Sequence, residues 1–180
     1  MLILNSFQKI DIQILDFIDR YLQFTILDRI MLIITRLGNG GLVWILLSIY
    51  LIYSNNYRIE GYMVIISMVL TAILGEGLIK HLIKRTRPFI KIDQRILLIS
   101  KPMTYSFPSG HAASSFAVAG VFIKMNTDIS IYITILASLI AFSRLYLNVH
   151  YLSDVLIGVI LGLLCSIVVY NLFNTLVLSN

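Results

Sequence analysis

Charged residues are scarce in this chain of 180 residues. Asp, Glu, Lys and Arg make up 13% of it, while 58% is hydrophobic and the mean hydropathy is +0.90. Soluble domains carry about 25% charged and roughly 45–50% apolar residues, so this composition excludes an ordinary soluble protein. The apolar runs are far longer than the roughly 10-residue alternating strands of a membrane barrel. We therefore predict an integral membrane protein that crosses the bilayer with helices.

Cysteine, internal repeats and low-complexity tracts are also lacking. Cys165 is the one cysteine and lies in an apolar run, so a disulfide framework and a thiolate metal site are excluded. We expect this side chain to serve packing. Residues 1–13 have no basic start followed by an uninterrupted apolar core, and no cleaved secretory signal is expected. The length predicts a single domain over residues 1–180.

Residues 1–40 have the pattern of helices that lie at a membrane surface. Over residues 8–20, apolar side chains recur at helical spacing with charged ones between them, which predicts an N-terminal interfacial amphipathic helix. An ordinary packed amphipathic helix is the alternative. Residues 24–37 are apolar but carry three charges, so we expect a second interfacial or half-inserted helix. The glycine-rich residues 38–41 should end it, because glycine permits conformations that a helix does not.

Five apolar runs after residue 40 are candidates for membrane spans. The first, residues 42–53, is shorter than the roughly 17 residues that cross a bilayer, so it should begin in the glycine stretch or continue through it as a broken helix. The other four are residues 62–79, 107–123, 131–147 and 155–178. The predicted fold class is all-α, a polytopic transmembrane helical bundle of residues 41–180 with five to six spans. Gly158 and Gly162 permit close packing of helices, which we expect within the bundle.

Three short polar clusters interrupt the apolar sequence. They are Lys80 with Arg87-Pro88, then Pro108-Ser109-Gly110-His111, then Ser143-Arg144 followed by His150 and Asp154. Ionisable groups near lipid are costly and indicate a functional site with paired partners. If the spans alternate in direction, all three clusters emerge on the same membrane face. The sequence therefore predicts one site built from three segments.

The cations of these clusters suit a multivalent anion. Lys80 and Arg87 are two helical turns apart, so a helix that continues past its span and is stopped by Pro88 would place both on one face, with Lys84 between them. Arginine offers a planar fork for phosphoryl oxygens and lysine a mobile charge. Glu76, one turn before Lys80, is expected to pair with it.

The second and third clusters add donors and acid–base groups. Ser109 and Gly110 open a helix whose N–H groups and dipole favour an anion, although a serine at this place can also be a purely structural cap. His150 and Asp154 are one turn apart, so the carboxylate can orient the imidazole, which makes His150 a candidate nucleophile. His111 is then available as the general acid.

In this order, the residues resemble the type 2 phosphatidic acid phosphatase superfamily. Its pattern is a lysine, six residues and Arg-Pro; then Pro-Ser-Gly-His; then Ser-Arg, five residues, histidine, three residues and aspartate, and this sequence matches every element. The resemblance implies a metal-independent phosphatase without a cofactor. It implies that His150 attacks phosphorus to give a phosphohistidine, Asp154 orients it and His111 protonates the leaving group. It also implies that the phosphoryl oxygens are held by Lys80, Arg87, Ser109, Gly110 and Arg144.

A site between helices at a membrane face suits a lipid phosphate whose tail stays in the bilayer. Undecaprenyl diphosphate is the favoured substrate, and phosphatidic acid, phosphatidylglycerophosphate and the phosphates of lipid A are the other candidates that the resemblance suggests. Membrane lipids are the expected partners, with no nucleic acid. A non-catalytic protein that binds anionic head groups would not need His111, His150 and Asp154. The vanadate-dependent haloperoxidases share the anion-site pattern but are soluble, which this hydropathy contradicts.

Two considerations conflict over which membrane face carries the site. With residues 1–40 on the active-site side, that side holds all of the 14 Lys and Arg residues except Arg58 and Lys124, and the positive-inside rule would place it in the cytosol. Three of those cations are explained by phosphate binding. The family resemblance favours the outer face of a bacterial plasma membrane, which is the orientation that we expect.

Overall fold

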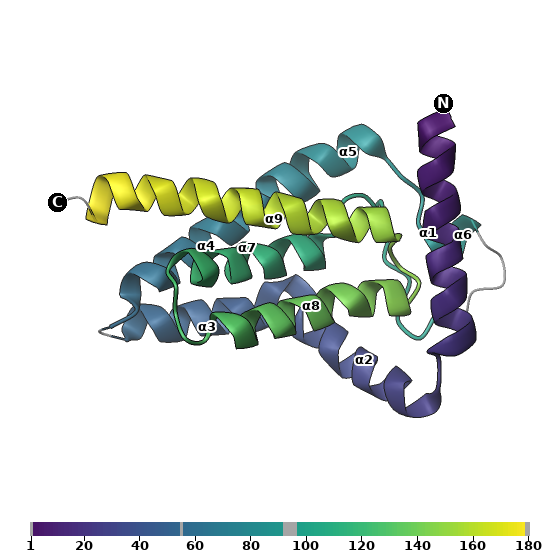
Figure 1. Cartoon of the computed structure of the whole chain (residues 1–180), viewed down its shortest axis with the longest axis horizontal. Coiled ribbons are helices and arrows are strands. Elements are labelled where there is room, and N and C mark those ends of the chain that lie inside the picture. The colour runs from purple at the N-terminus through teal and green to yellow at the C-terminus, as the bar shows by residue number, and fades with distance from the viewer. Residues whose placement is uncertain (1, 55, 92–96, 179–180) are drawn as a thin grey trace.

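The computed structural model describes residues 2–54, 56–91 and 97–178. Within these ranges the chain folds into helices and short connections, with no strand (Figure 1). The predicted all-α class is therefore confirmed.

The N-terminal helices lie at one end of the molecule. Helix α1, Leu2–Tyr21, runs across the end of the bundle (Figure 1). Its buried side chains Leu15 and Ile18 pack against residues of α8 and α9. Phe17, on the other side of α1, is 54% exposed. That this helix lies at the membrane interface stays a prediction.

Helices α2 and α3 form a bent pair around the glycine stretch. Helix α2 covers Thr25–Leu37 and α3 covers Leu42–Tyr53, with an angle of 46° between them. Gly40 and Gly41 have φ of 58° and 70°, values that only glycine adopts at little cost. The broken helix that the sequence predicted here is present.

The remaining helices form the bundle. Their bounds are α4 Arg58–Ala72, a π-helical stretch Ile73–Ile79, α5 Lys80–Ile83, α6 Pro88–Lys91, α7 Gly110–Lys124, α8 Ser130–Tyr146 and α9 Leu152–Phe173, followed by a π-helical turn Asn174–Leu178. Helix α7 is central and packs against α4, α8 and α9. A Cβ atom on Gly158 would lie 2.7 Å from the carbonyl oxygen of Ser109, and Gly162 faces the backbone of Ala113 and Ala117 as closely. The small-residue motif thus packs α9 against α7 within one chain.

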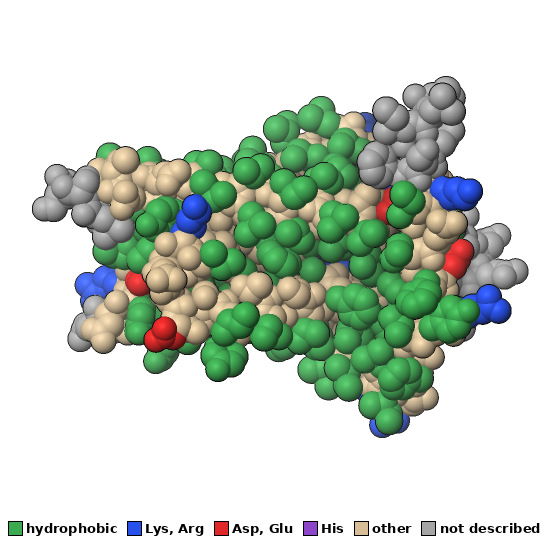
Figure 2. Space-filling view, in the orientation of Figure 1, with side chains coloured by type: hydrophobic (Ala, Val, Ile, Leu, Met, Phe, Trp, Pro, Cys, Tyr) green, Lys and Arg blue, Asp and Glu red, His purple; other side chains and the backbone are tan. Residues whose placement is uncertain are grey.

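Among the described residues, length and composition identify two helices that can cross a membrane. They are Arg58–Ile90 and Leu152–Leu176, and the bent pair α2–α3 would be a third. Helices α7 and α8 have 15 and 17 residues, shorter than a typical span of about 20, so the count of five to six spans stays a prediction. Figure 2 shows a largely hydrophobic face, with charged side chains gathered toward the two ends of the bundle.

The helix that carries Lys80 ends earlier than the sequence predicted. Helix α5 stops at Ile83 because Lys84 adopts a left-handed conformation, with φ of 49°. Arg87 follows in a non-helical connection. The prediction that Lys80, Lys84 and Arg87 lie in a row on one helical face is therefore wrong. Pro88 begins α6 instead of stopping the previous helix. Proline suits this first helical position because its missing N–H has no partner to lose there.

Candidate active site

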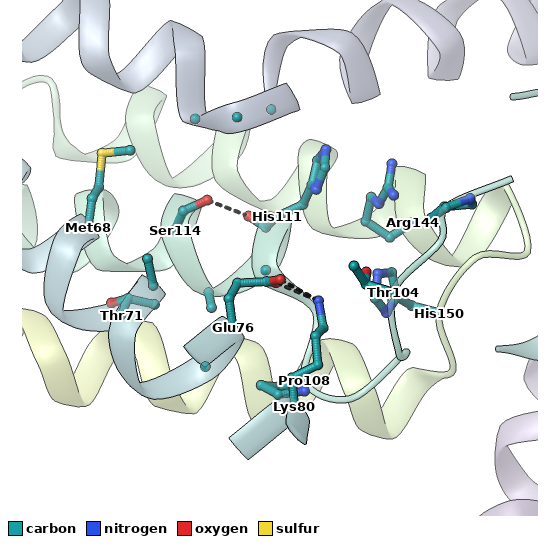
Figure 3. A pocket seen from close by; sticks show the side chains of 18 of the residues that line it. Met68, Thr71, Glu76, Lys80, Thr104, Pro108, His111, Ser114, Arg144 and His150 are labelled. Carbon is teal, nitrogen blue, oxygen red and sulfur yellow. Dashed lines mark hydrogen bonds and ion pairs between the residues drawn. The ribbon is translucent and has the colours of Figure 1, made fainter. Parts of the chain in front are cut away.

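A pocket of about 420 Å³ lies where α4, α5, α7, α8 and the bent pair meet (Figure 3). Six of the eight predicted site residues line it: Lys80, Arg87, Gly110, His111, Arg144 and His150. The three polar clusters therefore converge, as the alternation of spans predicted. The other two, Ser109 and Asp154, are fully buried behind it. The N–H of Ser109 donates to the backbone oxygen of Asp154 over 3.0 Å, which joins the second cluster to the third.

His150 lies in the connection that precedes α9. Its Nε2 is 3.2 Å from Nη1 of Arg87. A guanidinium group can only donate, so this contact requires the lone pair of the imidazole on Nε2 and its proton on Nδ1. Nδ1 is 3.7 Å from Oδ2 of Asp154, longer than a hydrogen bond, and has no hydrogen-bond partner among the described residues. The ring thus has the tautomer in which Nε2 can act as a nucleophile.

Burial sets the charge state of His150. The pKa of the imidazole is lowered to about 4, mainly by burial and also by the charges of Arg87 and Arg144. Asp154 raises this pKa but does not offset the other effects. The ring is therefore neutral at physiological pH, as a nucleophile must be. An unfolded histidine titrates near 6.5, so the native state should lose stability as the pH falls from there to about 4.

Ring-nitrogen NMR of histidine-labelled protein should show this state directly. At about pH 5, where an ordinary histidine is mostly charged, we expect His150 to be neutral with its proton on Nδ1. The signal that disappears in His150→Gln assigns the residue. An imidazolium signal for His150 at that pH would contradict the assignment.

Arg87 is held by several acceptors. Its Nε donates to the backbone oxygen of Thr104 over 2.7 Å, and Nη1 donates to that of Val149 over 2.8 Å. Nη2 donates to the Thr104 hydroxyl and to the backbone oxygen of Tyr105. The guanidinium is therefore fixed beside His150 before any substrate binds.

Lys80 is paired with Glu76, as the sequence predicted. Its Nζ lies 2.6 Å from both carboxylate oxygens, and the side chains of Lys80 and Glu76 are 5% and 45% exposed. Figure 3 shows the two joined across the middle of the pocket. A Cβ atom on Gly110 would overlap Oε1 of Glu76, so a larger residue here would displace the end of the Glu76 side chain. An entering anion must compete with Glu76 for Lys80.

Residues 25–41 also contribute to the site. Nη1 of Arg144 donates to the hydroxyl of Thr35 on α2, while Nε of Arg144 is buried without a partner among the described residues. Nε2 of His111 lies 3.0 Å from Oδ1 of Asn39. Thr35 and Asn39 lie far from the motifs in sequence and were not predicted as site residues. The glycines around Asn39 were the one available signal, because they interrupt a helix for no other visible reason.

A second network supports Asp154 from behind. Oδ1 of Asp154 accepts from Nη1 of Arg85 over 2.5 Å and Oδ2 accepts from the N–H of Tyr151 over 2.9 Å. Arg85 also donates to Asp11 of α1 over 2.6 Å, and Asp11 accepts from the N–H and hydroxyl of Ser153. The N-terminal helix is thus tied to the beginning of α9. Sequence reasoning missed Arg85 and Asp11 because a basic run and an amphipathic helix have many charges without a specific role.

We predict that Asp11→Asn lowers both thermal stability and turnover. The amide keeps the size of the side chain but loses the ion pair to Arg85, so Asp154 is held less firmly. Because the effect reaches the imidazole through two intermediates, we expect kcat to fall between about 3- and 10-fold. Thermal unfolding in detergent and phosphate release measure the two effects. The exposed Asp128→Asn, at the other end of α7, is the control, and an equal loss in both variants would refute this role.

The described residues include no group of three or more His, Cys, Asp or Glu side chains that could hold a metal ion. The polar atoms of the pocket are mainly cationic donors and imidazoles. Such a set can hold a phosphoryl group, attack it and move a proton.

Relatives of known sequence carry out phosphate chemistry on polyprenyl lipids. The sequence model of the PAP2 superfamily matches residues 61–178. An undecaprenyl-diphosphatase of Sulfolobus acidocaldarius is 33% identical over 144 residues, which are 79% of this chain and 68% of that protein. A decaprenylphosphoryl-5-phosphoribose phosphatase of Mycobacterium tuberculosis is 38% identical over 87 residues, 47% of this chain and 46% of that protein.

Two crystal structures share the fold. The transmembrane PAP2-type phosphatidylglycerolphosphate phosphatase of Bacillus subtilis has a TM-score of 0.78 at 26% identity, over 96% of this chain and 88% of that one. LpxE of Aquifex aeolicus gives the same TM-score and identity over 89% and 94% of the two chains. Together with the apolar helices and the convergence of all three motifs in one pocket, these matches show that the chain is an integral membrane phosphatase that belongs to the PAP2 superfamily.

Proposed function

We propose that the protein hydrolyses the phosphomonoester or diphosphate of a membrane lipid through a phosphohistidine on His150. The observation that carries this proposal is the contact between Arg87 and Nε2 of His150, inside a pocket that also holds Lys80 and Arg144. A nucleophile whose lone pair lies on the nitrogen that faces a cluster of cations suits attack on a phosphoryl group. The reaction is proposed to need neither a metal ion nor a cofactor.

The reaction begins when the phosphoryl group displaces Glu76 from Lys80. A phosphoryl oxygen replaces Nε2 of His150 as the acceptor of Nη1 of Arg87, which frees the lone pair. Nε2 then forms a bond to phosphorus, the bond from phosphorus to the leaving oxygen breaks, and His111 gives that oxygen its proton. Asp154 stabilises the positive ring. Fixed cations supply most of the rate enhancement in phosphoryl transfer.

The second half of the reaction returns the enzyme to its starting state. His111, now neutral, takes a proton from water, and the oxygen of that water attacks phosphorus. The bond between phosphorus and Nε2 breaks, and inorganic phosphate leaves. Ser109 and Gly110, at the beginning of α7, add the positive end of a helix to the phosphate site.

The shape of the pocket supports an amphiphilic substrate. Met68 and Ala72 of α4 and Gly75 of the π-helical stretch form an apolar part of the lining. Figure 3 shows Met68 and Thr71 on one side of Glu76, with Arg144 and His150 on the other. A phosphate can bind between the cations while its tail leaves along α4. Undecaprenyl diphosphate is the proposed substrate, supported by the name of the Sulfolobus relative, and phosphatidylglycerophosphate and phosphatidic acid are the other candidates.

The experiment is phosphate release from a panel of lipid phosphates in detergent with a chelator present. Undecaprenyl diphosphate, phosphatidylglycerophosphate and phosphatidic acid are compared at equal detergent ratios. We expect the diphosphate to give the largest kcat/KM. Activity that returns only with a divalent metal would contradict the mechanism. A protein that binds all three lipids and releases no phosphate would instead be a non-catalytic binder of anionic head groups.

We further propose that residues 1–40 lie at the membrane interface on the side of the active site, and that this side is the outer face of a bacterial plasma membrane. The last described turn, Asn174–Leu178, lies at the opposite end of the bundle from α1 (Figure 1). With five spans, a reporter fused to the C-terminus should therefore be cytosolic. An external reporter would reverse the orientation.

A further inference from the structure

We infer that Asn39, in the break between α2 and α3, is a positioning residue that holds the imidazole of His111 for proton transfer. Oδ1 of Asn39 lies 3.0 Å from Nε2 of His111, although the two residues are 72 positions apart. The inference rests on the proposed function, because it assigns the group that orients the general acid of that reaction.

The backbone of the break brings Asn39 to this place. Gly40 and Gly41 have left-handed conformations that turn the chain between the two helices. Gly38 lies directly against the ring, since a Cβ atom there would be 2.8 Å from Cδ2 of His111 and 2.7 Å from Cγ2 of Ile140. In Figure 3, His111 points toward the ribbon of this segment. The glycines on both sides of Asn39 thus allow close approach, and within the described ranges Asn39 supplies the side-chain hydrogen bond of the ring.

The chemistry of the two ring nitrogens follows from this contact. A general acid must be an imidazolium, whose nitrogens both donate, so Asn39 must present its amide oxygen. Nε2–H then stays with Asn39 through the cycle, and Nδ1 carries the proton that the leaving oxygen receives and that water later returns. Without Asn39, the ring can rotate, and the N–H of Nδ1 is no longer held in the orientation that proton transfer to the leaving oxygen requires. General acid catalysis contributes about 10²- to 10⁴-fold, so loss of the orientation should cost part of that factor.

The choice of an amide over a carboxylate also has a consequence. The other titratable groups of the pocket are Glu76, Lys80, Arg87, Arg144 and His150. Most are cationic or become so, which makes the proton of His111 easy to lose. A neutral partner orients the ring without opposing that loss. An aspartate at position 39 would place a negative charge beside Nε2 and hold the proton more strongly.

The test separates leaving groups that need a proton from those that do not. On a lipid phosphate with an alkoxide leaving group, Asn39→Ala should lower the rate at which the protein is phosphorylated within one turnover by about 10- to 100-fold. On 4-nitrophenyl phosphate, whose leaving group departs without protonation, the loss in this rate should be less than about 3-fold. The exposed Asn171→Ala is the matched control and should behave as wild type on both substrates. Equal losses of Asn39→Ala on both substrates would mean a structural role and overturn the inference.

Asn39→Asp adds a readout that packing alone would not move. The carboxylate should keep His111 protonated to higher pH, so the alkaline limb of the kcat profile on the lipid phosphate should move upward by about one pH unit. An unmoved limb would count against the inference.

Ring-nitrogen NMR tests the contact independently of activity. Asn39→Ala should shift the Nε2 signal of His111 and leave that of His150 in place. An unshifted signal would overturn the inference even in an active enzyme. If the signal shifts but the wild-type protein hydrolyses neither substrate, the contact is supported and the proposed function is refuted.

Discussion

Replacing His150 by glutamine is expected to abolish turnover, with kcat falling at least about 10⁴-fold. Glutamine retains polarity and approximate size, and its amide can still accept from Arg87, so the pocket should keep its shape. It cannot form the bond to phosphorus that the mechanism requires. Phosphate release from the lipid substrate measures the loss. His81→Gln is the matched control, because His81 packs edge-on against Tyr105 and is absent from the pocket lining.

The same variant tests the covalent intermediate. When wild-type enzyme is mixed with labelled substrate and quenched within one turnover, the label should appear on the protein and be lost in acid, as expected of a phosphorus–nitrogen bond. His150→Gln should show none. His111→Ala should still take up label when the leaving group needs no proton, because His111 acts on the leaving oxygen and on water. Label retained by His150→Gln would mean that another residue is the nucleophile. Turnover of this variant above 1% of wild type, which is a loss of less than about 10²-fold, would mean the same.

The sequence predicted the members of the site better than their geometry. The three clusters converge because alternating helices bring particular ends together, and that inference needs only the order of apolar runs. The conformation of residues 84–88 could not be read in the same way. A helix through Lys80 and Arg87 fits the spacing, but Arg87 instead reaches Thr104, Val149 and His150. Those acceptors are distant in sequence, and tertiary contacts outweigh local helix preference.

The N-terminal residues show the second limit. Their amphipathic pattern predicts a helix and its buried face. The spacing of apolar residues does not predict which polar side chains form hydrogen bonds with distant parts of the chain. Asp11 is fully committed to Arg85 and Ser153, and Thr35 and Asn39 contact Arg144 and His111. An apolar pattern specifies the buried face of a helix. A single hydrogen bond depends on which residue of another helix lies opposite in the folded chain. Residues 1–40, for which no role in the site was predicted, therefore contact Arg144 and His111 directly and support Asp154 through Arg85.

Replacing Arg87 by methionine is expected to lower kcat/KM by about 10²- to 10³-fold. Methionine fills a similar volume without donors, so the substrate loses the cation that contacts the nucleophile. Arg87→Lys should recover little, because one ammonium cannot match a planar fork that donates in several directions. Arg58→Met is the control, since Arg58 is exposed and donates to the backbone of Ile52. Phosphate release from the lipid substrate gives the kinetic constants.

Vanadate separates binding of the anion from damage to the fold. As a phosphate analogue it should inhibit wild type, and its inhibition constant should rise in Arg87→Met in parallel with the loss of kcat/KM. Arg87 also holds the connection at Thr104 and Val149, so the melting temperature of Arg87→Met should fall as well. Thr104→Val is the comparison, because it removes the hydroxyl that accepts from Arg87 and leaves the cation in place. If Thr104→Val matched the melting temperature of Arg87→Met but retained vanadate binding, the lost affinity would belong to the guanidinium. Unchanged vanadate affinity in Arg87→Met would remove Arg87 from the phosphate site and leave it as a structural clamp on the loop of His150.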